Sequence, residues 1–278
     1  MAVSPEDTRI LQASAASFAA VGGVLAVMSV RSRPGKVSPM AGGGRAGRWM
    51  RSAFLGLLAC SDFVRAASCL WVAGHLPAGV GTALGRLVVW GPAYLSVAAF
   101  SVAAVYLGQI HAVAMMQSYR GLADTVAAVN ALAFVWLLVT SAAAATGRPA
   151  ILAGRMGGRT VAGVLAAVTA LWACLILHYG RRVFVYLAEP DNTAPTPGVR
   201  RARAFSTVVP IMLAFKVVWA AAVAGDICMI VDTDGLPPGV LTMAMVALGE
   251  FAPSAATALL LTRQRKSAVG SASWPLLE

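Results

Sequence analysis

The chain has 278 residues, of which 59% are hydrophobic and only 12% are charged, and its mean hydropathy is +0.75. A soluble domain carries about a quarter of its residues as charges, so this composition excludes a water-soluble globule. The net charge of +11 is typical of nucleic-acid binding, but here the basic residues lie between apolar runs, which favours a topological role without direct binding of nucleic acid.

Seven apolar runs follow one another, and each is long enough for a membrane-spanning helix. Backbone groups in lipid must be satisfied within the segment, which requires helix, and the short alternating segments of a membrane β-barrel are absent. The third and fifth runs exceed the length of a perpendicular span, so we expect them to tilt or to project beyond the hydrocarbon. The sequence therefore predicts an all-α, polytopic bundle of seven transmembrane helices. The runs are 10–30, 52–75, 87–116, 122–146, 160–187, 204–231 and 239–262.

The segments between the runs predict the topology. Residues 31–51 combine glycine, proline and basic residues, and residues 188–203 are rich in proline and arginine, so both are expected to be loops. Fifteen lysines and arginines lie in the first, third and fifth loops and the tail, with Arg181 and Arg182 at the end of the fifth run counted with the fifth loop, against five in the N-terminus and the other loops. This asymmetry predicts that the N-terminus lies outside or in a lumen and that the C-terminus is cytosolic. Residues 1–278 form a single domain, and residues 263–278 form a short cytosolic tail.

Signatures of an enzyme or a metal site are absent from the sequence. There is no H-E-x-x-H, G-x-S-x-G, P-loop or C-x-x-C motif, so we expect a non-enzymatic protein without cofactor or metal. The four cysteines all fall inside apolar runs, where we expect small buried side chains rather than disulfides. They are Cys60, Cys69, Cys174 and Cys228.

Four charged residues lie near the middle of apolar runs, at similar depth. An ionisable side chain in a span costs roughly 2.5–3.5 kcal/mol on insertion scales and is a functional candidate. Asp62 and Arg65 are three residues apart on one helix and are expected to pair locally, and Lys216 and Glu250 are expected to be neighbours on consecutive helices. Two interpretations stay open: structural ion pairs that join the helices, or a midplane site for an ion, a proton or a small ligand.

Other polar residues in the runs have ordinary explanations. Gln109 and His111 lie toward the cytosolic end of the third run, where they can face lipid headgroups, and Asn130 can hydrogen-bond across helices. Pro210 and Pro253 are expected to kink their helices. The large aromatic residues in the runs are expected to pack or to lie at the interface rather than to form a ligand cage. They are Trp90, Tyr106, Trp172 and Trp219.

Short motifs in several runs resemble those of a known family. The stretch from Leu248 to Ala255 is similar to the Glu-Ile-Leu-Pro-Ser stretch in the last span of the tobamovirus multiplication family of seven-span membrane proteins, and the stretch from His178 to Phe184 is similar to its Tyr-Gly-Gly-Arg-Leu-Phe. Gln109 stands where the family has an acid, and Lys216 where it has arginine. The residues that carry the resemblance are Gln109, Asn130, Tyr179, Gly180, Arg181, Glu250 and Pro253.

The resemblance implies a membrane anchor or scaffold rather than catalysis. Plant members bind tobamovirus replication proteins at vacuolar membranes, and animal relatives, described as G-protein-coupled-receptor-like, act on small GTPases at lysosomes. By resemblance, the partners are therefore the lipid bilayer, cytosolic proteins such as small GTPases at the basic loops, and anionic lipids. The expected location is an endomembrane, with the plasma membrane left open. The alternatives are a divergent receptor, although Asp-Arg-Tyr-like and Asn-Pro-x-x-Tyr-like motifs are missing, and a proton or small-solute transporter that uses the midplane charges.

Overall fold

The structure is a computed structural model that describes residues 5–32, 42–74, 83–115, 120–148, 155–188, 213–221 and 250–259, and within these residues all regular structure is helical. Five helices are long, and residues 213–221 and 250–259 form two shorter helical segments. The long helices are α1 (Pro5–Ser32), α2 (Gly42–Gly74), α3 (Ala83–Ala114), α4 (Arg120–Thr146) and α6 (Arg155–Ala188).

All five long helices are long and apolar enough to cross a membrane, as judged by length and composition. The all-helical, multi-pass membrane character expected from the sequence is therefore confirmed for the described residues. The predicted extra length of the third and fifth runs is also confirmed, because α3 has 32 residues and α6 has 34. At 1.5 Å per residue each measures about 50 Å, against a hydrocarbon layer of roughly 30 Å.

The outer surface of the bundle is apolar, as lipid requires. On α4, Leu132 is 70% exposed, and Val135, Leu138 and Val139 are exposed beside it. Only 33% of the apolar window of α4 and 28% of that of α1 are buried inside the protein. In water such a surface would drive aggregation, whereas in hydrocarbon it carries no penalty.

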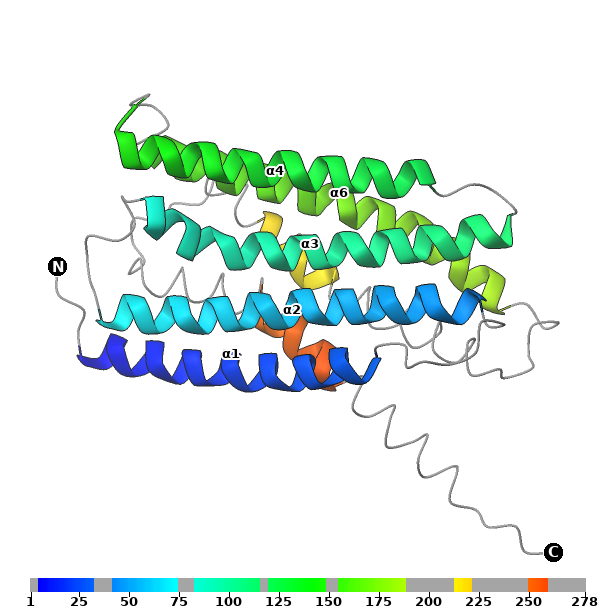
Figure 1. The fold of residues 1–278 in the computed structure, drawn as a ribbon, viewed down its shortest axis with the longest axis horizontal. Coiled ribbons are helices and arrows are strands. Elements are labelled where there is room, and N and C mark those ends of the chain that lie inside the picture. The colour runs from blue at the N-terminus through cyan, green and yellow to red at the C-terminus, as the bar shows by residue number, and fades with distance from the viewer. Residues whose placement is uncertain are drawn as a thin grey trace, which may run out of the picture.

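The helices form two layers (Figure 1). α1, α2, α3 and α4 lie side by side in the order of the chain, and α6 packs behind against both α3 and α4. Residues 213–221 and 250–259 lie behind the first layer, where Leu213 and Ala258 join a core built from α1, α2, α3 and α6. The second segment also reaches α1, since the rings of Phe18 and Phe251 meet edge to face with centroids 5.2 Å apart. The two short segments therefore complete the core around the middle of α2 and α3.

α1 and α2 approach closely at small residues. A Cβ atom on Gly22 would lie 3.2 Å from the Cβ of Asp62, a tight contact, so the glycine helps the two backbones to come this near. Farther along, the Ser29 hydroxyl donates to the Ser52 carbonyl at 2.8 Å, and the Ser52 hydroxyl donates to the Ser29 carbonyl at 3.1 Å. Such hydrogen bonds between helices are favourable in lipid, where no water competes.

Several boundaries differ from the sequence prediction. α2 begins at Gly42, inside the expected loop 31–51, because a helix already formed in the membrane propagates into flanking residues at little cost. Arg86, counted as a loop residue, lies in α3, and Arg155 and Arg159, counted in the fourth loop, lie in α6. α4 ends as expected, with Gly147 at a φ of 69°, a left-handed conformation that glycine adopts freely. The outer parts of the sixth and seventh runs, the loop 188–203 and the tail lie outside the described residues.

The expectation that all cysteines are buried was wrong for two of them. Cys69 is buried, but Cys60 and Cys174 are exposed, and all three are free. The reason is that a span in a membrane bundle is apolar both on its packed face and on its lipid face, so an apolar run does not identify the buried side. Cys228 lies outside the described residues.

Candidate intramembrane ionic site

All four charged residues expected inside the spans are buried, and they lie near one another. Asp62 and Arg65 come from α2, Lys216 from the segment 213–221, and Glu250 from the segment 250–259, and none is more than 7% exposed. The charge of Lys216 interacts with Glu250, Arg65 and Asp62, and the charge of Asp62 interacts with Glu250 and Lys216. We call these four residues the ionic cluster.

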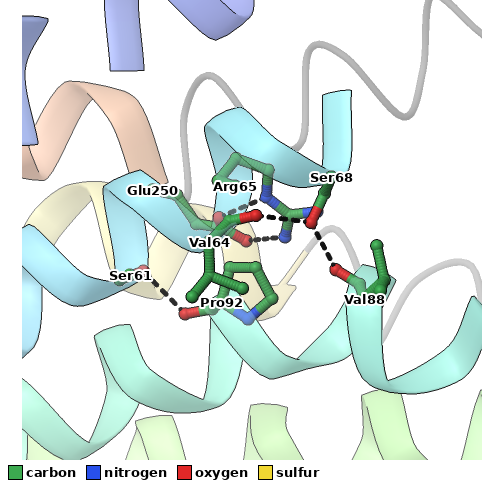
Figure 2. A network of polar contacts seen from close by, with 7 residues as sticks. All are labelled: Ser61, Val64, Arg65, Ser68, Val88, Pro92 and Glu250. Carbon is green, nitrogen blue, oxygen red and sulfur yellow. Dashed lines mark hydrogen bonds and ion pairs between the residues drawn. The ribbon is translucent and has the colours of Figure 1, made fainter. Parts of the chain in front are cut away.

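Arg65 and Glu250 form a bidentate ion pair across the helix interface (Figure 2). The Nε atom of Arg65 donates to Oε2 of Glu250 at 2.7 Å, and Nη2 donates to Oε1 at 2.5 Å. Each nitrogen thus meets its own carboxylate oxygen, which is the strongest pairing that these groups can make. The expected local pair of Asp62 with Arg65 was therefore wrong, because the carboxylate of Glu250 meets the guanidinium from the facing helix.

Asp62 is left without such a partner. It is 1% exposed, and neither of its carboxylate oxygens has a hydrogen-bond partner of normal geometry among the described residues. The Ser254 hydroxyl is the nearest polar neighbour and interacts with the carboxylate from the segment 250–259. On the α1 side, Asp62 faces Gly22, which is uncharged. Asp62 is thus a buried carboxyl group without an ion-pair partner among the described residues, and the Ser254 hydroxyl is the donor that interacts with it.

Lys216 is held between aromatic rings. Its Nζ atom lies 5.6 Å from the ring centroids of both Phe100 and Trp219, a distance at which the ring faces attract a cation. It is 1% exposed, and Trp219 itself is buried in a second core cluster together with α3, α4 and α6. The sequence correctly placed Trp219 as a packing residue, but the same ring also stabilises the buried charge.

Two serines of α2 tie this helix to α3 at a proline. Pro92 has no N–H group, so the carbonyl of Val88, four residues before it, lacks its usual donor within the helix. The Ser68 hydroxyl lies 2.8 Å from that carbonyl oxygen and can supply the donor, and it can also donate to the Val64 carbonyl on its own helix at 2.7 Å (Figure 2). Ser61 donates to the Pro92 carbonyl at 2.7 Å. The two serines lie on either side of Arg65 along α2, and this fixes the face of α2 that carries Asp62 and Arg65.

Glu250 lies at a local irregularity of its own helix. Residues 250 and 251 adopt a π-helical turn before the α-helix that continues to 259, and Pro253 follows within one turn. The Thr257 hydroxyl donates back to the Pro253 carbonyl at 2.8 Å. Single π-helical turns inside helices often lie at functional sites, because they displace one side chain from the regular helical face.

The residues of the family resemblance do not gather at the ionic cluster, apart from Glu250 and Pro253. Gln109 and Tyr179 lie toward the other end of α3 and α6, roughly 25 Å along α3 from Pro92. There the ring of His111 is 5.7 Å from that of Tyr179, and its Nε2 atom is 3.2 Å from Nη1 of Arg182.

Three further family-motif residues can be placed in the fold. Gly180 packs near Leu107, while Arg181 is exposed. Asn130 makes the expected bond across helices, with Nδ2 donating to the Ser101 hydroxyl at 2.7 Å.

Sequence reasoning did not single out Ser61, Ser68 and Ser254, although a signal existed. Ser61 and Ser68 are seven residues apart and so share a helix face with Arg65, and Ser254 is four residues after Glu250. Trp172 was expected to pack or to lie at the interface, and it is buried, but its indole nitrogen has no hydrogen-bond partner among the described residues. Within the same part of the chain, no three His, Cys, Asp or Glu side chains are grouped closely enough to hold a metal ion.

The family resemblance rests on the sequence motifs alone. No protein-family model, no curated protein and no solved structure matches the chain.

Proposed function

We propose that this chain is a proton-coupled membrane carrier of seven helical spans, in which Asp62 binds and releases the coupling proton. The segments 213–221 and 250–259 are the described parts of the apolar runs 204–231 and 239–262, which supports assigning them to a sixth and a seventh span. The observation that carries the proposal is the buried Asp62 carboxylate, which has no ion-pair partner among the described residues and whose oxygens make no hydrogen bond of normal geometry there, although the Ser254 hydroxyl interacts with them.

Opposing effects on Asp62 make it suited to proton exchange. Burial favours the neutral, protonated carboxyl group, the Ser254 hydroxyl favours the carboxylate, and the negative charge of Glu250 favours the neutral form again. The positive charge of Lys216 favours the carboxylate, whereas Arg65 is already paired with Glu250. A change in the distance between Asp62 and Lys216 would therefore shift the balance between the two forms, which is the property that a carrier needs in order to take up a proton on one side and release it on the other.

The Arg65–Glu250 pair has a different role in this proposal. Each of its two carboxylate oxygens already accepts a charge-assisted hydrogen bond, so protonation of Glu250 would break the pair. Of the two interpretations drawn from the sequence, the structural ion pair fits Arg65 and Glu250, and the midplane site fits Asp62.

Counting protons tests the role of Asp62. The purified full-length protein in lipid nanodiscs is brought from neutral to alkaline pH in a weakly buffered solution, and the protons released are measured with a pH-indicator dye. We expect the wild type to release one proton more per molecule than Asp62→Asn, and Asp124→Asn, which alters an exposed carboxylate on α4, to match the wild type. Equal release from the wild type and Asp62→Asn would contradict the proposal.

The anchor function implied by the resemblance stays a prediction, together with a cytosolic C-terminus and an endomembrane location. The helical residues 42–48, which include Arg45 and Arg48, precede the apolar part of α2 that starts at Trp49. A basic helical turn beyond the span supports contact with anionic lipids or acidic proteins. Proximity labelling from the C-terminal tail tests this function: enrichment of small GTPases or trafficking proteins supports it, and enrichment of heterotrimeric G-protein subunits would favour a receptor instead.

A further inference from the structure

A small pocket lies beside the ionic cluster, between α3, α6 and the segment 213–221. About 190 Å³ of space among its lining residues, open space included, is not filled by atoms, and in this conformation none of it is wide enough for a water molecule. A ligand would therefore enter only with a movement of one of the three helices. The lining residues are Val97 and Phe100 of α3, Thr169 and Trp172 of α6, and Leu213 and Lys216.

The polar groups of the pocket are donors. Lys216 contributes an ammonium group, and Trp172 contributes an indole N–H that has no acceptor among the described residues although the residue is only 1% exposed. The Thr169 hydroxyl is already used, since it donates to the Leu165 carbonyl at 2.7 Å. A buried indole N–H ordinarily has a partner, so its unused donor here points to a ligand that brings an acceptor.

The charges of the ionic cluster indicate when such a ligand binds. Arg65 and Glu250 neutralise each other as an ion pair. Asp62 and Lys216 interact through their charges and make the remainder of the cluster neutral while Asp62 is ionised. A proton on Asp62 leaves the Lys216 ammonium as one uncompensated positive charge in a low-dielectric site, where it is costly. An anion next to Lys216 removes that cost, so proton and anion favour each other's binding.

We propose that this pocket binds a small monocarboxylate through Nζ of Lys216 and Nε1 of Trp172, together with one proton on Asp62. A carboxylate has two oxygens and can accept from both donors at once, and the apolar side chains of Val97, Phe100 and Leu213 suit a short hydrocarbon body. While the pocket is empty, the rings of Phe100 and Trp219 stabilise the ammonium group. This inference rests on the proposed function, because it names the solute that moves with the proton.

Calorimetry on the full chain in lipid nanodiscs tests the coupling, with propionate as the probe and chloride as the comparison anion. Titrations at alkaline pH, where Asp62 is ionised before the anion binds, in buffers of different ionisation enthalpy give the number of protons taken up per anion bound. We expect one proton per propionate in the wild type, and binding without proton uptake in Asp62→Asn. Propionate binding without proton uptake in the wild type, or an equal affinity for chloride, would overturn the proposal.

Variants of the two donors test the pocket. Trp172→Phe keeps the ring but removes the N–H, so we expect propionate affinity to fall roughly tenfold or more. Trp136→Phe is the matched control, because Trp136 Nε1 is also buried without a partner among the described residues but does not line the pocket, and its affinity should equal that of the wild type. Lys216→Met should abolish binding, and thermal unfolding of each variant confirms that it is folded. An unchanged affinity in folded Trp172→Phe would overturn the assignment.

The failure of this inference can be told apart from the failure of the proposed function. If propionate does not bind while the wild type still releases one proton more than Asp62→Asn, the carboxylate site is wrong and Asp62 remains a proton-binding residue. If Asp62→Asn releases as many protons as the wild type, the proposed function itself is wrong.

Discussion

Arg65 and Asp62 lie three residues apart on the same helix, yet their surroundings differ completely. Arg65 reaches a carboxylate 185 positions away in sequence, whereas Asp62 has no donor of normal geometry among the described residues. Removing one partner from a buried ion pair leaves an uncompensated charge, while replacing a protonated carboxyl group by an amide changes no charge. The two acids of the ionic cluster should therefore respond differently to the same chemical change.

Glu250→Gln should lower the free energy of unfolding by about 3 kcal/mol, because it leaves the Arg65 guanidinium buried without its counter-charge. Asp62→Asn should leave stability nearly unchanged at neutral pH, because the amide and the proposed protonated carboxyl group are both neutral. Thermal and denaturant unfolding in the same nanodiscs measure both. Asp124→Asn, on the exposed face of α4, is the control for the change from acid to amide. Equal losses in Glu250→Gln and Asp62→Asn would mean that both acids are structural.

The four charged positions could be predicted from the sequence, since any charge in an apolar run stands out. The pairing among them could not, because it depends on which helices meet and at what height. Local spacing favoured the wrong pair, Asp62 with Arg65. A spacing of three residues predicts an ion pair only when no charged residue on another helix competes for the same partner. That the indole N–H of Trp172 lacks a hydrogen-bond acceptor among the described residues could not be predicted either. A tryptophan in an apolar run has the same sequence pattern whether or not its N–H is hydrogen-bonded.

At the scale of the elements, Pro92 and Ser68 compensate each other across two helices. The proline removes a donor from inside α3, and the hydroxyl on α2 can replace it at the Val88 carbonyl. The serine can also bond to Val64 within its own helix, so the structure alone leaves two uses for one hydroxyl group. A double-mutant cycle can separate them.

Ser68→Ala should cost about 1–2 kcal/mol of unfolding free energy in the wild type, because the Val88 carbonyl is left buried without a donor. In the Pro92→Ala background the same change should cost about 1 kcal/mol less, because the new N–H of residue 92 supplies the donor. The measurement is chemical unfolding of the two single variants and the double variant. A cost that is the same in both backgrounds would show that Ser68 serves only Val64.

The contact between α1 and α2 depends on the position of one glycine. Gly22→Leu should destabilise the bundle by roughly 1–3 kcal/mol, because its Cβ would come within 3.2 Å of the Asp62 Cβ and 3.4 Å of the Ala59 carbonyl oxygen. Gly23→Leu is the matched control, since a Cβ at Gly23 has nothing within 4 Å. Unfolding of the two variants side by side gives the difference, and similar stabilities would argue against the close approach.

The existence and order of the five long helices followed from hydrophobicity, but their ends did not. α2 and α6 begin inside glycine- and arginine-rich segments that sequence patterns assign to loops. Composition marks where a helix leaves hydrocarbon, whereas the helix itself continues until its backbone hydrogen bonds lose their support. The same ambiguity explains Cys60 and Cys174, which face outward from apolar runs.

At the scale of the whole molecule, an odd number of spans has a direct consequence. Seven spans predict that the two ends of the chain lie on opposite sides of the membrane, with the C-terminus in the cytosol. Epitope tags at each end, tested in sealed and in permeabilised vesicles with an impermeant protease, measure this. In sealed vesicles the protease should cleave one tag and leave the other intact, and in permeabilised vesicles it should cleave both. Both tags on the same side would refute a seven-span layout.

Within that bundle, the ionic cluster requires every partner to lie at the same depth among the helices. Arg65 and Glu250 hold α2 against the segment 250–259, Lys216 is fixed between rings of α3 and its own helix, and Asp62 remains the group whose charge can change. The proposed proton exchange therefore requires that the carboxyl group of Asp62 carry a proton inside the bundle.

Infrared spectroscopy of the protein in nanodiscs observes that proton directly. A protonated carboxyl group in an apolar site has a C=O stretching band that an ionised carboxylate lacks. The wild type at neutral pH is predicted to show this band, Asp62→Asn to lose it, and Asp124→Asn, which alters an exposed carboxylate on α4, to keep it. A wild-type spectrum without the band, or one that keeps the band in Asp62→Asn, would contradict the account.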